Sequence, residues 1–116
     1  MPKGISDFYR GDTQVYRLIL KKEDGTPVDL TGSSVWFTIK RNVKDLDTEA
    51  IVQKKVDNHV DPSNGITEIK LEPSDTNTAT PGQYVYDFQL VKPNGDVKTL
   101  LAGKVKILAD VTRSTT

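Results

Sequence analysis

The only histidine of this chain, His59, lies between two carboxylates in a polar loop at residues 57–65. A histidine acts as a catalytic base only when a nucleophile and an orienting group lie close to it. Its neighbours Asp57 and Asp61 belong to the same polar loop, and no catalytic motif surrounds them. With one histidine and no cysteine, any site that needs two imidazoles or a thiolate is excluded. We therefore expect His59 to be a solvated loop histidine.

The same loop carries several hard oxygen ligands of the kind that Ca²⁺ prefers. Their spacing is not that of an EF-hand loop, and the closing glutamate of such a loop is absent. Aspartate, asparagine and serine are also ordinary turn formers. The sequence leaves Ca²⁺ binding by this loop open, and we assign no metal and no cofactor. The candidate ligands are Asp57, Asn58, Asp61, Ser63 and Asn64.

The tripeptide Arg10-Gly11-Asp12 matches the integrin recognition sequence. Recognition by an integrin would require this tripeptide at an exposed loop tip outside cells. Here it directly precedes an expected strand, and Gly11 and Asp12 more simply set the turn into that strand. We do not expect a role in cell adhesion.

Three basic pairs, Lys21-Lys22, Lys40-Arg41 and Lys54-Lys55, could converge into an anion site. Acidic residues are interleaved with them, and the 116-residue chain has 16 basic and 16 acidic residues and a formal net charge of zero. No aromatic residues alternate with the basic ones in the pattern typical of base stacking. We expect these lysines to end strands at the solvent edge, and we expect no nucleic-acid partner.

Motifs of catalysis and membrane insertion are also missing from the sequence. There is no nucleophile elbow, P-loop or dinucleotide fingerprint, so we expect no enzyme and no small-molecule substrate. No apolar run approaches the roughly 18 residues of a membrane-spanning helix, so we expect no membrane partner. Residues 1–7 lack the apolar region of a signal peptide, which indicates a protein that is not secreted by that route.

The elements that would position these residues are β-strands. Valine, isoleucine and threonine are abundant, and they favour a pleated surface. Alternation places Phe37 and three residues of a later strand, Tyr86, Phe88 and Leu90, inward, and it turns Trp36 outward. Residues 42–49 are expected to form a loop with a short helix through Leu46. Residues 74–80 are expected to form one helical turn capped by Ser74, and Gly103 is expected to mark a bulge. The expected strands are 14–22, 27–32, 35–40, 51–56, 66–71, 83–92 and 97–110.

Turn residues separate these strands at regular intervals, which is typical of an immunoglobulin-like Greek-key sandwich. We therefore predict an all-β fold of about seven antiparallel strands. We expect a single domain over residues 1–116, with a short N-terminal arm at 1–9 and a frayed tail at 112–116. Tyr84 sits where such folds place a tyrosine corner. The residues with structural turn roles are Gly11, Asp12, Gly25, Asp29, Gly32, Gly82 and Tyr84.

An outward Trp36 is the strongest pointer to a contact surface, because aromatic residues are enriched in interface cores. A second interpretation remains open, in which Trp36 packs under the 42–49 loop. Small and apolar residues of the last strand share its expected face. The candidate interface comprises Trp36, Thr38, Leu100, Ala102 and Leu108.

The order of turns and strands resembles small structural proteins of tailed phages of the baseplate-upper-protein N-terminal type. The resemblance extends over nearly the whole chain. Its motifs are mostly turn chemistry, and their combination in one order carries the likeness. The segments are Arg10–Thr13, Asp24–Gly32, Val35–Ile39, Gly65–Ile66, Leu71–Thr76, Gly82–Asp87, Leu101–Val105 and Asp110–Arg113.

This resemblance implies an immunoglobulin-like domain of tails, baseplates or fibre attachments, encoded by phages or prophages and made in the bacterial host cytoplasm. In such baseplate proteins the domain joins the particle and further segments follow it. Here the sequence stops at Thr116, which favours a connector, adaptor or decoration subunit of the virion. The expected partners are other virion proteins, with a trimer or hexamer of this chain as one arrangement. The alternative is a module that binds carbohydrate or the host surface.

Overall fold

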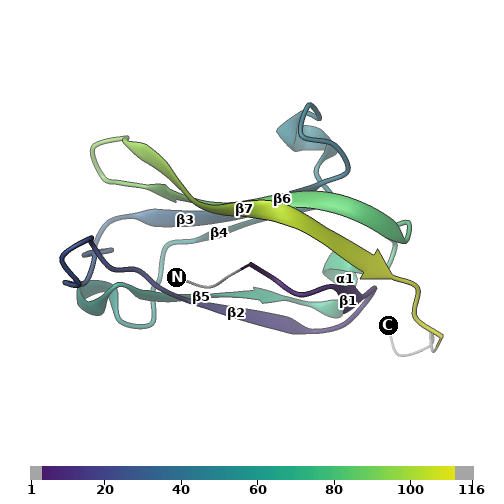
Figure 1. Ribbon diagram of the computed structural model, residues 1–116, viewed down its shortest axis with the longest axis horizontal. Helices are drawn as coiled ribbons and strands as arrows, with labels where there is room; N and C mark the ends of the chain where they lie inside the picture. The colour runs from purple at the N-terminus through teal and green to yellow at the C-terminus, as the bar shows by residue number, and fades with distance from the viewer. Residues whose placement is uncertain (1–3, 112–116) are drawn as a thin grey trace.

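The computed structural model describes residues 4–111 as two β-sheets packed face to face (Figure 1). One sheet has five strands in the order β1-β7-β6-β3-β4, and the other pairs β2 with β5. The prediction of an all-β sandwich is confirmed. The strands are β1 (Phe8–Tyr9), β2 (Gln14–Ile19), β3 (Ser34–Lys40), β4 (Val52–Val56), β5 (Ile66–Leu71), β6 (Gly82–Val91) and β7 (Val97–Leu108).

The chain passes between the sheets four times, at β1 to β2, β2 to β3, β4 to β5 and β5 to β6. This places β2 with β5 and β3 with β6 and β7, as the immunoglobulin fold places its strands B and E apart from C, F and G. One pairing differs from the all-antiparallel expectation. β1 runs parallel to β7, with Phe8 opposite Ile107. The expected N-terminal arm therefore ends in a strand, and Phe8 is a buried core residue.

Alternation along the strands builds the core between the sheets. Val35, Phe37 and Ile39 of β3 are fully buried, and the alternate residues of β6 that face them are buried too. The rings of Phe37 and Phe88 stack with centroids 4.4 Å apart. Tyr16 of β2 meets Phe37 edge-on at 5.5 Å, so this aromatic cluster joins the two sheets.

Two tyrosines of the core differ in how their hydroxyl groups are satisfied. The Tyr84 hydroxyl donates a hydrogen bond of 2.5 Å to the carbonyl oxygen of Thr80, four residues upstream, which is the geometry of a tyrosine corner. The buried Tyr16 hydroxyl has no hydrogen-bond partner among residues 4–111. Burial raises the pKa of Tyr16 to about 12, and the nearby Tyr86 adds to the rise.

Removing each of these two hydroxyl groups by a Tyr→Phe substitution should change the free energy of unfolding in different ways. Tyr84→Phe should lower the free energy of unfolding by about 1–2 kcal/mol, because it leaves the Thr80 carbonyl without its donor. Tyr16→Phe should be neutral or stabilising, because it removes a buried group that has no partner within residues 4–111. Urea unfolding of both variants tests this pair, and a larger loss for Tyr16→Phe than for Tyr84→Phe would contradict it.

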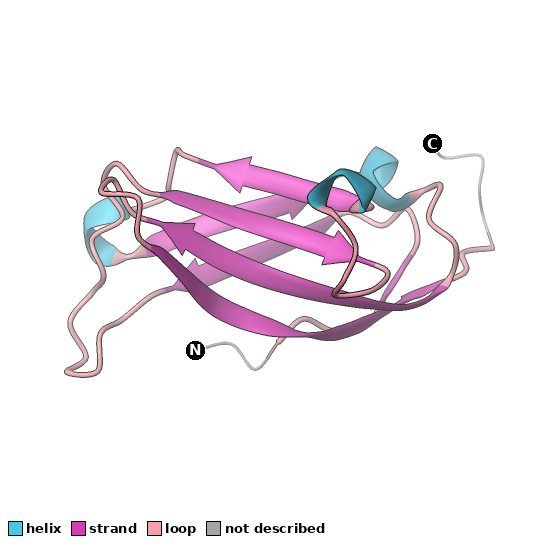
Figure 2. Ribbon diagram, turned by 90° about the horizontal axis from the view of Figure 1, so that it is seen from above, coloured by secondary structure: helices cyan, strands magenta, loops and turns pink. Residues whose placement is uncertain are grey.

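Short helical turns lie at the ends of the sandwich and leave the sheet faces uncovered by helices (Figure 2). The expected helix through Leu46 begins one residue later, as the 3₁₀ turn η1 (Asp47–Glu49), and a second such turn is η2 (Pro62–Asn64). Helix α1 (Pro73–Thr76) is not capped by Ser74. Its N-cap is Glu72, whose backbone N–H donates to the Asp75 carboxylate at 2.7 Å.

The bulge of β7 lies at Leu100, and the expectation of a bulge at Gly103 was wrong. Phe88 pairs with Leu101 and the next residue, Gln89, pairs with Thr99, so Leu100 is the extra residue. Gly103 has a different role, because it pairs with Tyr86 and lies beneath that side chain. A Cβ atom at Gly103 would lie 3.0 Å from the Tyr86 hydroxyl oxygen.

Several turns adopt backbone angles that suit glycine. The φ angles are +83° at Gly11, +88° at Gly25, +76° at Gly32 and +147° at Gly82. Asp29 accepts a 2.9 Å hydrogen bond from the backbone N–H of Thr31, which closes the turn before β3.

The termini extend beyond the described part of the chain. The tail expected at 112–116 lies outside the described residues. Within residues 4–111, no helix is long enough and apolar enough to span a bilayer.

Candidate functional site

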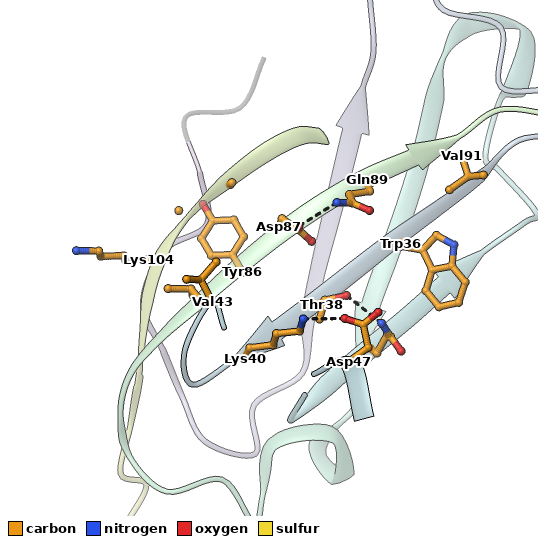
Figure 3. A pocket seen from close by; sticks show the side chains of 14 residues that line it. Trp36, Thr38, Lys40, Val43, Asp47, Tyr86, Asp87, Gln89, Val91 and Lys104 are labelled. Carbon is orange, nitrogen blue, oxygen red and sulfur yellow. Dashed lines mark hydrogen bonds and ion pairs between the residues drawn. The ribbon is translucent and has the colours of Figure 1, made fainter. Parts of the chain in front are cut away.

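A groove of about 720 Å³ lies on the outer face of the five-stranded sheet (Figure 3). Its floor is formed by outward residues of β3 and β6, and its walls come from β4, β7 and the loop between β3 and β4. The lining residues are Trp36, Thr38, Lys40, Val43, Asp47, Gln53, Val85, Tyr86, Asp87, Gln89, Val91, Ala102, Gly103 and Lys104.

Strand register sets the order of side chains on this floor. Trp36 of β3 is paired with Gln89 of β6, and one step along the same face Thr38 is paired with Asp87. Asp87 is in turn paired with Ala102 of β7. Because alternate residues of a strand share a face, these pairs form parallel rows across the sheet.

The loop between β3 and β4 forms the rim of the groove and is tied to the floor by Lys40. The Lys40 ammonium group lies 2.7 Å from a carboxylate oxygen of Asp47 and donates to the carbonyl oxygen of Asp45 at 3.0 Å. The hydrogen bond from Lys40 and its positive charge lower the pKa of Asp47. The side chain of Val43 is 79% exposed on this rim.

Asp87 is a half-buried carboxylate in the middle of the floor. The hydrogen bond that it accepts from the Gln89 amide nitrogen is long, at 3.3 Å (Figure 3). Burial raises the pKa of Asp87, and the negative charge of Asp47 acts in the same direction. Lys40 and the Gln89 hydrogen bond lower it, but they do not cancel the effect of burial. The groove therefore holds a poorly solvated negative charge.

A raised pKa means that the ionised form of Asp87 destabilises the fold at neutral pH. The folded pKa lies above the ordinary value, so this penalty is complete above the folded pKa and disappears as the pH falls below the ordinary value of 3.8. Asp87→Asn should therefore be more stable than the wild type at about pH 7, with a difference that closes toward about pH 3. Urea unfolding across that range tests this prediction. A variant that is less stable at neutral pH, or a gap that widens in acid, would contradict it.

Trp36 faces outward, as alternation predicts, and is half-buried in the groove. The Lys55 ammonium group of β4 lies 5.6 Å from the centre of the indole, within the range of a cation–π contact. The sequence left two interpretations of Trp36 open, an exposed contact residue and a residue packed under the 42–49 loop. In the structure Trp36 lines the groove, and Val43 and Asp47 of that loop line the same groove.

The predicted interface residues divide into two groups. Trp36, Thr38 and Ala102 lie together in the groove. Leu100, displaced by the bulge, packs partly against the core, and Leu108 pairs with Tyr9 at the β1 edge, away from the groove.

Sequence reasoning did not name three residues of β6 that line the groove. Asp87, Gln89 and Val85 occupy outward positions of β6, so alternation alone contained the signal for them. The contribution of the rim could not be found in this way, because it depends on the Lys40–Asp47 ion pair.

His59 is not a solvated loop residue, so that expectation was wrong. One ring nitrogen, Nε2, donates to the carbonyl oxygen of Ser33 at 2.8 Å, and Nδ1 lies 2.9 Å from the hydroxyl oxygen of the fully buried Thr67. The ring links the loop to β5 and to the residue before β3, which is a structural role.

Two carboxylates of the same loop, Asp57 and Asp61, accept hydrogen bonds from side chains of this chain. Asp61 accepts a 2.8 Å hydrogen bond from the side-chain amide of Asn64, and Asp57 accepts one of 2.5 Å from the Ser34 hydroxyl. Within residues 4–111, no group of three or more histidine, cysteine, aspartate or glutamate side chains is placed to hold a metal ion.

The tripeptide at residues 10–12 lies against the fold. Arg10 forms a 2.9 Å ion pair with Asp110 and also donates to the carbonyl oxygen of Ala79. The backbone N–H of Gly11 donates to the hydroxyl of the buried Thr76 at 2.9 Å. The side chain of Arg10 is therefore held by contacts within the chain, and the tripeptide is not presented at a free loop tip.

The basic pairs Lys40-Arg41 and Lys54-Lys55 do not converge into a common anion site, because their members have separate partners. Lys54 pairs with Asp75 at 2.9 Å, and Lys40 pairs with Asp47. The guanidinium of Arg41 lies 4.9 Å from the centre of the Tyr84 ring, whereas Lys55 lies against Trp36.

A comparison with protein families decides the assignment. The model of the BppU N-terminal domain matches residues 2–101. The chain belongs to this family. It is therefore a structural domain of the phage baseplate, and this role implies a virion component that interacts with other virion proteins. The resemblance stated from the turn and strand residues is confirmed.

Comparisons with individual proteins are less informative. No curated protein sequence matches this chain at a significant level. Among solved structures, the chain is similar to the soluble domain of PmoD from Methylocystis sp. ATCC 49242 (Rockwell), with 13% identity, a TM-score of 0.48, and coverage of 90% of this chain and 77% of that chain. It is also similar to CopC from Methylosinus trichosporium OB3b, with 15% identity, a TM-score of 0.49, and coverage of 94% and 89%. Neither likeness is close enough to transfer a function.

Proposed function

We propose that this chain is a connector or adaptor of the phage tail or baseplate, encoded by a phage or prophage, which acts through protein–protein assembly and not through catalysis. The family match over residues 2–101 carries this proposal. The domain is a single immunoglobulin-like sandwich over residues 1–116. In the particle it contacts other virion proteins and also further copies of itself in a ring, because closed cyclic symmetry is the usual arrangement of homo-oligomers.

The assembly contact is the outer face of the five-stranded sheet, centred on Trp36, Thr38 and Ala102. Support comes from the half-buried indole and from the groove around it. Interfaces are enriched in aromatic residues at their cores, and hot spots lie in pockets that exclude water on binding. The other sheet exposes smaller apolar side chains, Val15 and Ile19, which offer less area to a partner.

Purified phage particles give the direct test of this function. The gene should be tagged in its own phage, and the particles purified through a density gradient. We expect the chain in the particles by mass spectrometry, and immunogold labelling should place it at the tail end that carries the baseplate. Expression of the chain in the host without incorporation into particles would refute the proposal.

A second candidate function is binding of carbohydrate on the host surface. One observation favours it: the Trp36 ring shares the groove with a carboxylate and two side-chain amides, Asp87, Gln53 and Gln89. An aromatic face beside hydrogen-bonding groups suits a sugar ring, which has an apolar face and a rim of hydroxyls. A glycan array decides this point. Specific binding that Trp36→Ala abolishes would favour it, and a blank array would remove it.

A further inference from the structure

We propose that the groove binds an extended segment of a partner virion protein in which a lysine or arginine side chain pairs with Asp87 and apolar side chains flank it on both sides. This inference rests on the proposed function, since it names the chemistry of the partner at the assembly face.

The length of the groove fits an extended chain. Its floor follows β6 from Val85 to Val91, and strand geometry gives this span a length of about 20 Å. An extended segment of about seven residues covers the same distance. The 3₁₀ turn η1 borders the groove through Asp47, and no other helix or strand of residues 4–111 lies over this face of the sheet, so the floor between these walls is open to an extended segment (Figure 1).

Charge selects a basic residue at the centre. Asp87 is half-buried, and the group that donates to it, at 3.3 Å, is the neutral amide of Gln89. The nearest lysine of the floor, Lys40, is already committed to Asp47 and to the Asp45 carbonyl oxygen. A partly desolvated carboxylate gains most from a charge-assisted hydrogen bond supplied by a partner. The remaining lysine of the groove, Lys104, is exposed at the edge of the groove and does not pair with the Asp87 carboxylate.

Apolar contacts define the two ends. Val85, beside the loop that carries Val43, lies two residues before Asp87 along β6. Val91, next to the row of Trp36, lies four residues after Asp87. Because alternate residues of an extended segment face the same side, the complementary pattern has apolar residues two positions on one side of the basic residue and four positions on the other. A phosphate-rich ligand is disfavoured, because Asp47 and Asp87 would repel it.

The test uses Trp36 as the reporter, because it is the only tryptophan of the chain and it lines the groove. The probe is the blocked peptide Val-Thr-Arg-Thr-Ser-Thr-Val, and the control peptide carries glutamine in place of arginine. Each is titrated into the full chain while tryptophan emission is followed. The protein variants are Asp87→Asn, which keeps the shape of the side chain, and Glu23→Gln, which removes an exposed carboxylate away from the groove. Circular dichroism establishes that both variants are folded.

We expect a saturable change in emission with the arginine peptide, and binding at least about tenfold weaker for the glutamine peptide or for Asp87→Asn. Glu23→Gln should bind as the wild type does. A flat titration into the millimolar range, equal binding of both peptides, or equal weakening by Glu23→Gln would overturn the inference. If the chain is found in purified particles while the titration is flat, the proposed function stands and this inference alone fails.

Discussion

Phe37→Ala is expected to lower the free energy of unfolding by about 3–5 kcal/mol, because it empties the centre of the aromatic core. Phe37 is fully buried, stacks on Phe88 at 4.4 Å and meets Tyr16 edge-on at 5.5 Å. The truncation would leave a cavity at the point where the two sheets meet, and a close-packed core cannot refill it without strain. Urea unfolding followed by circular dichroism measures the loss.

The neighbouring residue supplies the matched control. Trp36→Ala removes a larger ring from the same strand, but this ring lies on the outer face and is only half-buried. We expect it to cost less than about half as much as Phe37→Ala. If Phe37→Ala does not fold, Phe37→Leu should still fold with a smaller loss. An equal or larger loss for Trp36→Ala would place the indole in the core and contradict the assembly face proposed above.

Gly65→Ala is expected to cost about 3 kcal/mol or more, because both conformation and space oppose the added methyl group. The φ angle of Gly65 is +71°, and a Cβ atom would lie 2.4 Å from the Leu20 carbonyl oxygen and 2.9 Å from that of Val28. Both contacts are with backbone, so no side-chain movement can relieve them. The Gly65 carbonyl also accepts the Leu20 N–H at 2.8 Å, and any shift of the turn would strain this bond.

Gly25→Ala is the control that separates the cost of the left-handed backbone conformation from the cost of the steric contacts. Gly25 has a similar φ angle of +88°, but a Cβ atom there would meet nothing within 4 Å. Only the conformational cost of the left-handed region remains, about 1–2 kcal/mol. Thermal and urea unfolding of the two variants should show a clearly larger loss for Gly65→Ala. Equal losses would mean that the contacts with Leu20 and Val28 do not constrain the turn.

The sequence could predict which strand faces point inward, because the two-residue period follows from backbone geometry. This is why Phe37 and Trp36 were assigned to opposite faces. The same rule failed at Leu100, where one extra residue breaks the period, and alternation resumes after it. β1 was missed because two residues are too few to show any alternation. Its parallel pairing depends on contacts between residues about a hundred positions apart.

The groove could be predicted only in part. The outward positions of Trp36 and Asp87 follow from alternation, but the rim depends on the Lys40–Asp47 ion pair, and neither loop conformation nor charge pairing can be read from a period. His59 shows the same limit. Its partners Ser33 and Thr67 come from other parts of the chain, and only the fold brings them to the ring.

The central claim is that the outer face of the five-stranded sheet joins this chain to the virion, and incorporation into particles tests it most directly. Phage lacking the gene would be complemented with wild type, Trp36→Ala, or Ile19→Ala as the control on the opposite sheet, where the isoleucine is 46% exposed. The amount of chain in gradient-purified particles is then measured by quantitative mass spectrometry, with all three proteins shown to be folded and equally expressed. We expect Ile19→Ala to be incorporated like the wild type and Trp36→Ala to be reduced at least about tenfold. Normal incorporation of Trp36→Ala, or an equal loss for both variants, would contradict the account.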